Sequence, residues 1–151
     1  MLATLVLWLL ASAPAQTTTP ADWKIVKDSK GLCQIAVPPD WEALSENSGA
    51  AVFRDASTAI AVVTGQPGQA FKPLPESLLR LWRLRKDQLF ENTPRRIFYQ
   101  DRISKHSEEQ NGYSVSVPSK SGTCSCHVGA LLSVSKETVK TISMSLRPVP
   151  E

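Results

Sequence analysis

The three cysteines of this chain are the residues whose chemistry follows most directly from their spacing. Cys124 and Cys126 are two residues apart, so in a strand both side chains point to one face with Cα atoms about 7 Å apart, too far for an easy mutual bridge. Cys33 is therefore the better partner. The sequence predicts a Cys33–Cys126 or a Cys33–Cys124 disulfide with one thiol left free. The alternative is three reduced, buried cysteines that pack as small apolar residues.

A zinc or copper site is a second possibility, because the three cysteines and His127 supply enough ligands of the right kind. If residues 123–134 form a strand, however, His127 points away from both Cys124 and Cys126. The four residues also lack the paired spacing of strong zinc motifs. We therefore predict no metal site.

Catalytic chemistry has little support in the sequence. The two imidazoles are His106, in a polar stretch that resembles a turn, and His127, on the solvent side of its strand, and neither has a nucleophile or carboxylate partner at motif spacing. The glycines of residues 65–68 lack the Gly-Lys-Ser/Thr ending of a phosphate loop. We predict no catalytic residue, no cofactor-binding residue and no cofactor.

Arg85 is the unusual residue of an apparent amphipathic helix over Pro75–Asn92. At about 100° per residue it falls within the apolar face that includes Leu78 and Leu89. Such an arginine usually buries its stem and extends its charged head to the rim, or meets an internal carboxylate. The functional alternative is an anion site at Arg85 between helix and sheet.

The remaining elements are predicted from alternation and turn residues. Most stretches alternate apolar and polar residues with a period of two, which indicates half-buried strands, and the short connections between them indicate antiparallel neighbours. We expect an α+β fold, an antiparallel sheet with the long helix packed on one face. The predicted strands are Leu32–Val37, a hairpin of Ala50–Arg54 with Thr58–Thr64, Arg95–Ser104, Gly112–Val117, Thr123–Val134 and Thr138–Leu146, with a loop at Gly65–Pro75.

The first fifteen residues resemble a secretion signal. Leu2–Ala11 is an uncharged apolar run, and Ala13 and Ala15 put small residues at the positions that a signal peptidase reads. The run is shorter than the roughly 20 residues that span a bilayer. We expect a signal peptide at 1–15, a flexible lead-in at 16–22 and one α+β domain at 23–148. The protein would then be secreted or periplasmic, with no stable membrane span after signal removal.

Composition limits the classes of protein to which this chain can belong. A hydrophobic fraction of 42% and a charged fraction of 21% are those of a folded chain. The formal net charge of +3 is small, and the 17 basic and 14 acidic residues look scattered. Nucleic acid is therefore not an expected partner, because its binding needs a concentrated basic surface.

The segment Gly31–Trp41, with the sequence GLCQIAVPPDW, resembles the opening strand of the Mog1/PsbP-like superfamily. There a glycine, an alternating strand, a proline and a tryptophan occur in that order. The resemblance implies an α-β-α sandwich and a binding or accessory module, with no shared catalytic residues to carry over.

These observations predict an exported, non-enzymatic accessory or interaction module whose partner, a protein or a small ligand, the sequence does not identify. Two alternatives stay open. One is a secreted hydrolase or thiol-redox protein that uses a cysteine or a histidine. The other is a structural assembly protein that associates through a sheet edge.

Overall fold

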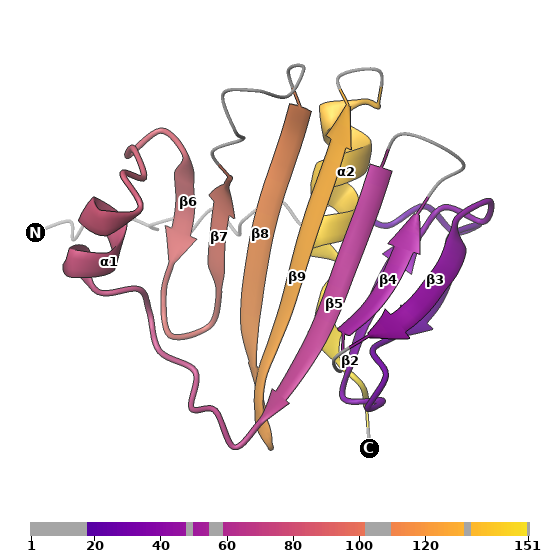
Figure 1. Cartoon of the computed structure of the whole chain (residues 1–151), viewed down its shortest axis with the longest axis horizontal. Coiled ribbons are helices and arrows are strands. Elements are labelled where there is room, and N and C mark those ends of the chain that lie inside the picture. Colours follow the sequence, from indigo (N-terminus) through magenta and orange to yellow (C-terminus); the bar gives the residue numbers. More distant parts are fainter. Residues whose placement is uncertain (1–17, 48–49, 55–58, 102–109, 132–133, 151) are drawn as a thin grey trace, which may run out of the picture.

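The computed structural model describes residues 18–47, 50–54, 59–101, 110–131 and 134–150. Two antiparallel sheets and two short helices make up this part of the chain (Figure 1). Within it, no helix is long and apolar enough to cross a membrane. The expected signal peptide, residues 1–15, lies outside the described residues. The elements are β1 (Lys24–Lys27), β2 (Cys33–Val37), β3 (Glu42–Asn47), β4 (Ala50–Arg54), β5 (Ala59–Pro67), α1 (Glu76–Leu81), β6 (Leu89–Asn92), β7 (Ile97–Gln100), β8 (Gln110–Ser119), β9 (Gly122–Leu131), α2 (Lys136–Met144) and β10 (Arg147–Pro148).

The large sheet has seven strands in the order β3-β4-β5-β9-β8-β7-β6, and every neighbouring pair is antiparallel. The predicted hairpin is confirmed as β4 and β5. The predicted loop at Gly65–Pro75 begins too early, because Gly65, Gln66 and Pro67 continue β5 and pair with β9. The strands predicted around β7, β8 and β9 are also present.

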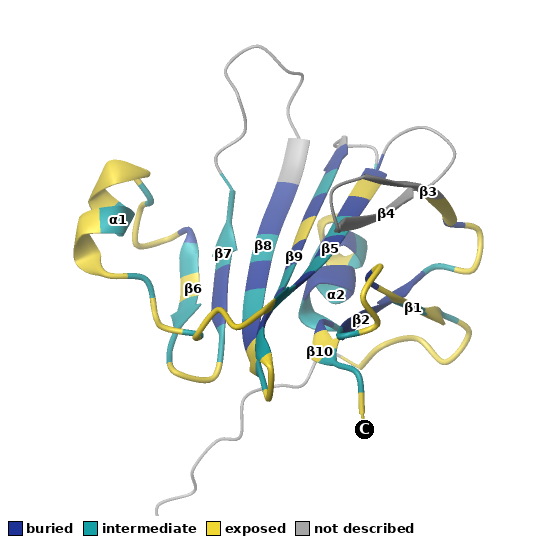
Figure 2. Ribbon diagram, turned by 60° about the horizontal axis from the view of Figure 1, so that its bottom comes forward, coloured by how far each residue is buried: buried dark blue, intermediate teal, exposed yellow. Residues whose placement is uncertain are grey.

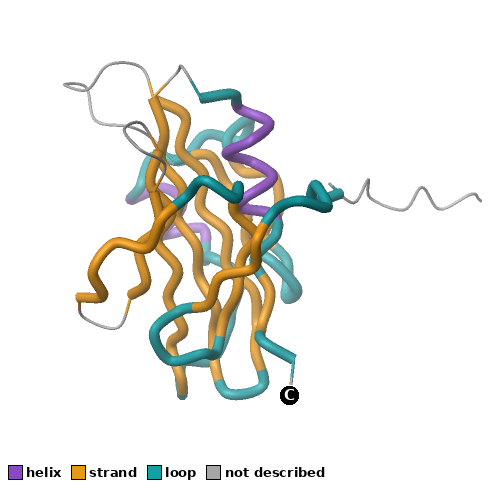
Figure 3. The backbone as a smooth tube through the Cα atoms, turned by 90° about the vertical axis from the view of Figure 1, so that its right-hand side faces the viewer, coloured by secondary structure: helices purple, strands orange, loops and turns teal. Residues whose placement is uncertain are grey.

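One face of the large sheet is covered by a second layer, formed by α2 and the small sheet β1-β2-β10 (Figure 3). Along β9 the inward residues Cys124, Cys126 and Val128 are buried, and they alternate with residues that are more exposed (Figure 2). Alternation of this kind is typical of a sheet with one covered face. We call the other face, towards the viewer in Figure 1, the open face.

Strand β2 lies within the second layer, and all five of its residues are buried. The alternation of Leu32–Val37 predicted a half-buried strand here, with Gln34 on the face opposite Cys33, Ile35 and Val37. Instead Gln34 is buried, because β1 and β10 flank β2 on both sides and the large sheet and α2 lie across it.

The prediction of an α+β sandwich with one long helix is wrong. The segment Pro75–Asn92 is helical only over α1, a helix of 6 residues none of which is buried. Arg83 takes a positive φ of 52°, and the backbone N–H groups of Arg83 and Leu84 bond back to the carbonyls of Arg80 and Leu79. This pattern of bonds is a Schellman motif, which ends the helix. The chain then pairs with β7 as the edge strand β6.

The helix that does cover the sheet is α2, in the segment Thr138–Leu146 that was predicted to be a strand. Its N-cap is Ser135, whose hydroxyl accepts a hydrogen bond from the backbone N–H of Thr138. Val139, Ile142 and Leu146 are buried against the sheets. The fold is therefore mostly antiparallel strand, and its covering helix lies near the carboxyl end of the chain.

Candidate functional site

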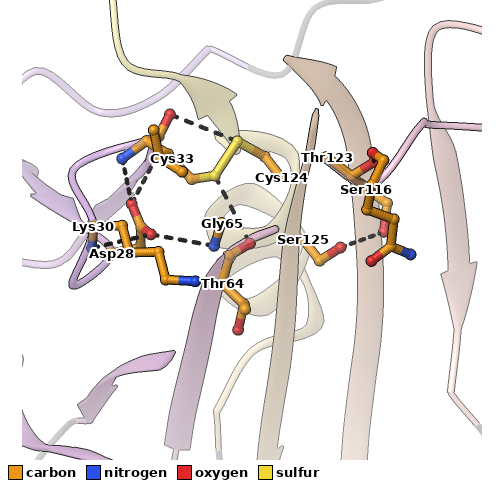
Figure 4. Close-up of a disulfide and its surroundings, with 11 residues drawn as sticks. Asp28, Lys30, Cys33, Thr64, Gly65, Ser116, Thr123, Cys124 and Ser125 are labelled. Atoms are coloured by element: carbon orange, nitrogen blue, oxygen red, sulfur yellow. Dashed lines mark hydrogen bonds between the residues drawn. A yellow bond between two sulfur atoms is a disulfide. The ribbon is translucent and has the colours of Figure 1, made fainter. Parts of the chain in front are cut away.

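The predicted disulfide is present and joins the two layers. Cys33 of β2 is bonded to Cys124 of β9, with 5.6 Å between their Cα atoms and a separation of 91 positions in the sequence (Figure 4). Of the two pairings that the sequence left open, the structure has Cys33–Cys124. Cys126 is free and buried, on the same face of β9.

Asp28 lies beside the disulfide and is almost fully buried. Its carboxylate accepts hydrogen bonds from four backbone N–H groups, at distances of 2.7 to 3.3 Å. The donors are Lys30, Leu32, Cys33 and Gly65, so the carboxylate ties the small sheet to the large one (Figure 4). Such a set of donors stabilises a buried carboxylate without a counter-charge. This cluster is structural.

Cys126 is poorly suited to thiol chemistry. Complete burial raises the pKa of its thiol to about 12. A nucleophilic or redox-active cysteine instead has a lowered pKa and an accessible sulfur. The structure therefore gives no support to a redox role for this residue.

The open face carries the one cluster of functional groups whose geometry suits a ligand. His127 of β9 lies opposite Ser114 of β8, and Ser114 lies opposite Tyr99 of β7, so the sheet register places the three side chains in one row. Asp101 follows directly after β7. Its Oδ2 atom lies 2.6 Å from Nδ1 of His127 and accepts a hydrogen bond from Oγ of Ser114 at 2.7 Å.

Asp101 fixes the orientation of the imidazole. Its oxygen is 2.6 Å from Nδ1, so the Nδ1–H donates to the carboxylate and Nε2 is left as the free ring nitrogen. The His127 side chain is 52% exposed and that of Asp101 is 22% exposed. No described residue bonds to Nε2, which is available to a ligand.

Tyr99 connects this cluster to an aromatic hollow. Burial raises the pKa of its phenol, a hydrogen bond with Ser114 opposes that rise and the charge of Asp101 adds to it. A shallow hollow of about 260 Å³ lies beside the cluster and is lined by Trp82, Leu84, Tyr99 and Asp101. The indole of Trp82 lies with its centroid 6.2 Å from that of Tyr99, and Trp82 is 45% exposed. One wall of the hollow is thus aromatic, and another carries the carboxylate that holds His127.

Further serines extend the polar character of this face. Ser116 and Ser125 form the next cross-strand pair after Ser114 and His127, and their hydroxyl oxygens are 2.9 Å apart. All four side chains are at least partly exposed. The sheet therefore presents a band of hydroxyl, imidazole and carboxylate groups beside an aromatic surface.

Arg85 is not where the sequence placed it. It lies beyond the end of α1, not on a helix face, and its side chain is exposed. The guanidinium forms two bonds with Asp87, of 2.9 and 3.0 Å, and these bonds raise the pKa of Arg85 and lower that of Asp87. Arg85 was predicted to lie between helix and sheet, as an anion site there would require. This placement is wrong, because the long helix does not form.

No group of three or more histidine, cysteine or acidic side chains among the described residues could hold a metal ion. His127 is on the opposite face of β9 from the two cysteines, as its alternation predicted. His106 lies outside the described residues. A larger hollow, of about 650 Å³, is lined by residues 31–32, 118–121 and 148–150.

Sequence reasoning placed His127 on the solvent side of its strand but missed its partners. Asp101 is 26 positions away in the chain, and the register of β7, β8 and β9 brings the two together. The one available signal was that Ser114 and His127 both occupy the polar side of alternating strands. The aromatic residues, Trp82 and Tyr99 among them, were expected to pack in the core, and the alternative was that a subset of them lines a groove for a peptide or glycan.

Comparison with known proteins adds the fold alone. No family model and no curated protein matches the sequence. A crystal structure of a protein from Bacteroides thetaiotaomicron is similar, with a TM-score of 0.55 at 12% sequence identity. The match covers 86% of this chain and 49% of that one, so the chain spans about half the length of that protein. The resemblance to the Mog1/PsbP-like superfamily is not tested by these comparisons and stays a prediction.

Proposed function

We propose that this chain is an exported binding module that holds a small hydroxylated ligand, such as a sugar residue, on the open face of its large sheet. The observation that carries the proposal is the linked row of Tyr99, Ser114, Asp101 and His127 beside the hollow under Trp82. The apolar face of a sugar ring packs against an aromatic side chain. Its hydroxyls both donate and accept hydrogen bonds, as the serine, imidazole and carboxylate groups of this row require.

The size of the hollow agrees with a small ligand. Its 260 Å³ lies just below the range of about 300–1,000 Å³ that is usual for drug-sized ligands. The hollow is shallow, so a longer glycan can extend from it across Ser116 and Ser125. Export is supported by the apolar leader at residues 1–15 and by the disulfide, since disulfides persist in oxidising compartments.

A hydrolase that uses His127 as a general base is the second candidate, and the Asp101–His127 pair favours it. The position of Ser114 argues against a serine nucleophile. In a catalytic triad the serine and the carboxylate bond to opposite nitrogens of the imidazole. Here Oγ of Ser114 is 3.1 Å from Nδ1, the same nitrogen that faces Asp101. Hydrolysis would therefore have to use water at Nε2.

Calorimetric titration with a panel of mono- and oligosaccharides tests the binding function. We expect saturable binding that weakens at least about tenfold in Trp82→Ala and in Asp101→Asn. Asp22→Asn, the same chemical change at an exposed position that is not part of the site, is the matched control and should bind like the wild type. The proposal is wrong if no saccharide binds, or if Trp82→Ala binds as tightly as the wild type. Turnover of a bound saccharide that His127→Gln abolishes would favour the hydrolase.

A further inference from the structure

The net charge of the chain is concentrated in one part of the structure. Residues 76–96, which we call the basic corner, contain six of the 17 basic residues and three of the 14 acidic ones. The rest of the chain holds equal numbers of the two kinds, so the basic corner carries the entire formal charge of +3. The excess of basic residues is therefore concentrated in one segment, whereas the composition suggested scattered charge.

Ion pairs within the basic corner leave three cations without a partner. Arg80 pairs with Glu76, Arg85 with Asp87 and Arg96 with Glu91. The unpaired cations are Arg83, Lys86 and Arg95, all of which are exposed and form no ion pair with the described residues.

Large apolar side chains are exposed at the same place. Leu81 is 74% exposed, Phe90 47% and Trp82 45%, and these are three of the five large apolar residues that are exposed in the described part of the chain. None of the residues of α1 is buried, and the helix lies beyond the edge strand β6 at the end of the sheet (Figures 1 and 2). Exposed apolar residues gathered in this way mark an interaction site.

Aromatic side chains lie next to β6 on both faces of the large sheet. Trp82 lies near Tyr99 on the open face. Phe90 packs against Phe98 and Tyr113, at centroid distances of 4.9 and 6.1 Å, on the covered face. A flat surface that meets the sheet edge-on can therefore contact apolar residues from both sides of the strand.

We propose that the basic corner docks the protein edge-on to an anionic lipid bilayer. Aromatic and aliphatic residues combined with arginine and lysine are the composition that lies in the interface of such a bilayer, where the apolar groups enter the headgroup boundary and the cations contact lipid phosphates. The charge of the corner is complementary to this partner. The corner includes Trp82 and Leu84, which also line the proposed saccharide hollow, but it contains neither Asp101 nor His127. The protein is thereby held at a membrane surface by its basic corner.

Vesicle flotation tests this proposal. The purified protein is mixed with vesicles of phosphatidylcholine containing phosphatidylglycerol, and with vesicles of phosphatidylcholine alone. We expect binding to the anionic vesicles, its loss as salt rises from about 0.1 M to about 1 M, and little binding to the neutral ones. Arg83→Gln/Lys86→Gln/Arg95→Gln should bind about 100-fold more weakly, and Leu81→Ser about tenfold more weakly.

Two matched variants make this test specific. Lys27→Gln/Lys30→Gln/Lys136→Gln removes the same charge from exposed positions elsewhere, and Ile60→Ser removes an exposed apolar residue elsewhere; both should bind like the wild type. Equal loss in the two triple variants would overturn the proposal, since net charge alone would then explain binding. Failure to bind anionic vesicles would also overturn it, including the case in which a soluble polyanion binds instead. All the variants keep Trp82, Asp101 and His127, so a negative result leaves the saccharide proposal standing.

Discussion

The backbone N–H of Gly65 donates to the carboxylate of Asp28 across the two sheets, with 3.2 Å between Gly65 N and Asp28 Oδ2. The approach is possible because residue 65 has no side chain. A Cβ atom at this position would lie 2.7 Å from Asp28 Oδ2 and 2.9 Å from Leu32 Cβ. The contact brings Cys33 over β5 and β9, where the disulfide with Cys124 forms.

Gly65→Ala should destabilise the protein by about 2–4 kcal/mol, because the added methyl group overpacks a buried site and displaces a carboxylate from its donors. Urea unfolding followed by tryptophan fluorescence measures the loss. Gly129→Ala is the control, since its Cβ would meet only Nε2 of His127 at an ordinary 3.6 Å. Equal midpoints for the two variants would show that the Asp28 contact contributes nothing.

Removal of the disulfide should lower the free energy of unfolding more than the loss of any single contact. Cys33→Ala/Cys124→Ala opens a loop of 91 residues, which corresponds to about 4–5 kcal/mol in the chain-entropy model. Differential scanning calorimetry of this variant beside Cys126→Ala separates the bridge from the buried thiol. Peptide mapping of the unreduced protein that recovered a Cys33–Cys126 link would contradict the pairing.

Stability should fall in alkaline solution, and Cys126 should be a main cause. Its pKa is about 12 in the folded protein against an ordinary 9.0. Below about pH 9 the thiol is protonated in both the folded and the unfolded state, and its contribution to the stability of the fold is fully present. From there to about pH 12 the unfolded state loses the proton first, and stability declines by up to about 4 kcal/mol.

Cys126→Ala should therefore flatten the decline of stability between about pH 9 and about pH 12. Burial also raises the pKa of Tyr99 and Tyr113, so part of the decline should persist in the variant. Unfolding midpoints taken soon after mixing, before thiol–disulfide exchange, provide the comparison. Parallel declines in wild type and variant would mean that the thiol is not buried as described.

The strands of the large sheet could be predicted because their alternation reflects a local rule. In β9 every second side chain meets the second layer, so Cys126 and Val128 had to be apolar while Ser125 and His127 did not. The same alternation also predicted β8 and the β4–β5 hairpin.

The helices could not be predicted in the same way. Residues 82–92 have good helix formers and no glycine, but Arg83 adopts a left-handed conformation that nothing in its side chain favours, and β6 gains its bonds from β7. In α2, Val139 and Ile142 lie in a segment that was predicted to be a strand. Their spacing and the cap at Ser135 were the signals for a helix.

The candidate site depends on long-range register, which a single sequence does not contain. Asp101 meets His127 because β7 and β9 both pair with β8. The disulfide was more accessible to prediction, because geometry excluded the Cys124–Cys126 pair and left two choices.

Nuclear magnetic resonance of the indole and imidazole groups during a saccharide titration tests the central claim most directly. We expect the signals of the Trp82 indole and the His127 ring to shift together with one dissociation constant, while the indoles of Trp23 and Trp41 stay in place. Shifts at Trp23 or Trp41 with Trp82 and His127 unmoved would contradict a ligand site on the open face, and so would the absence of any shift across the panel.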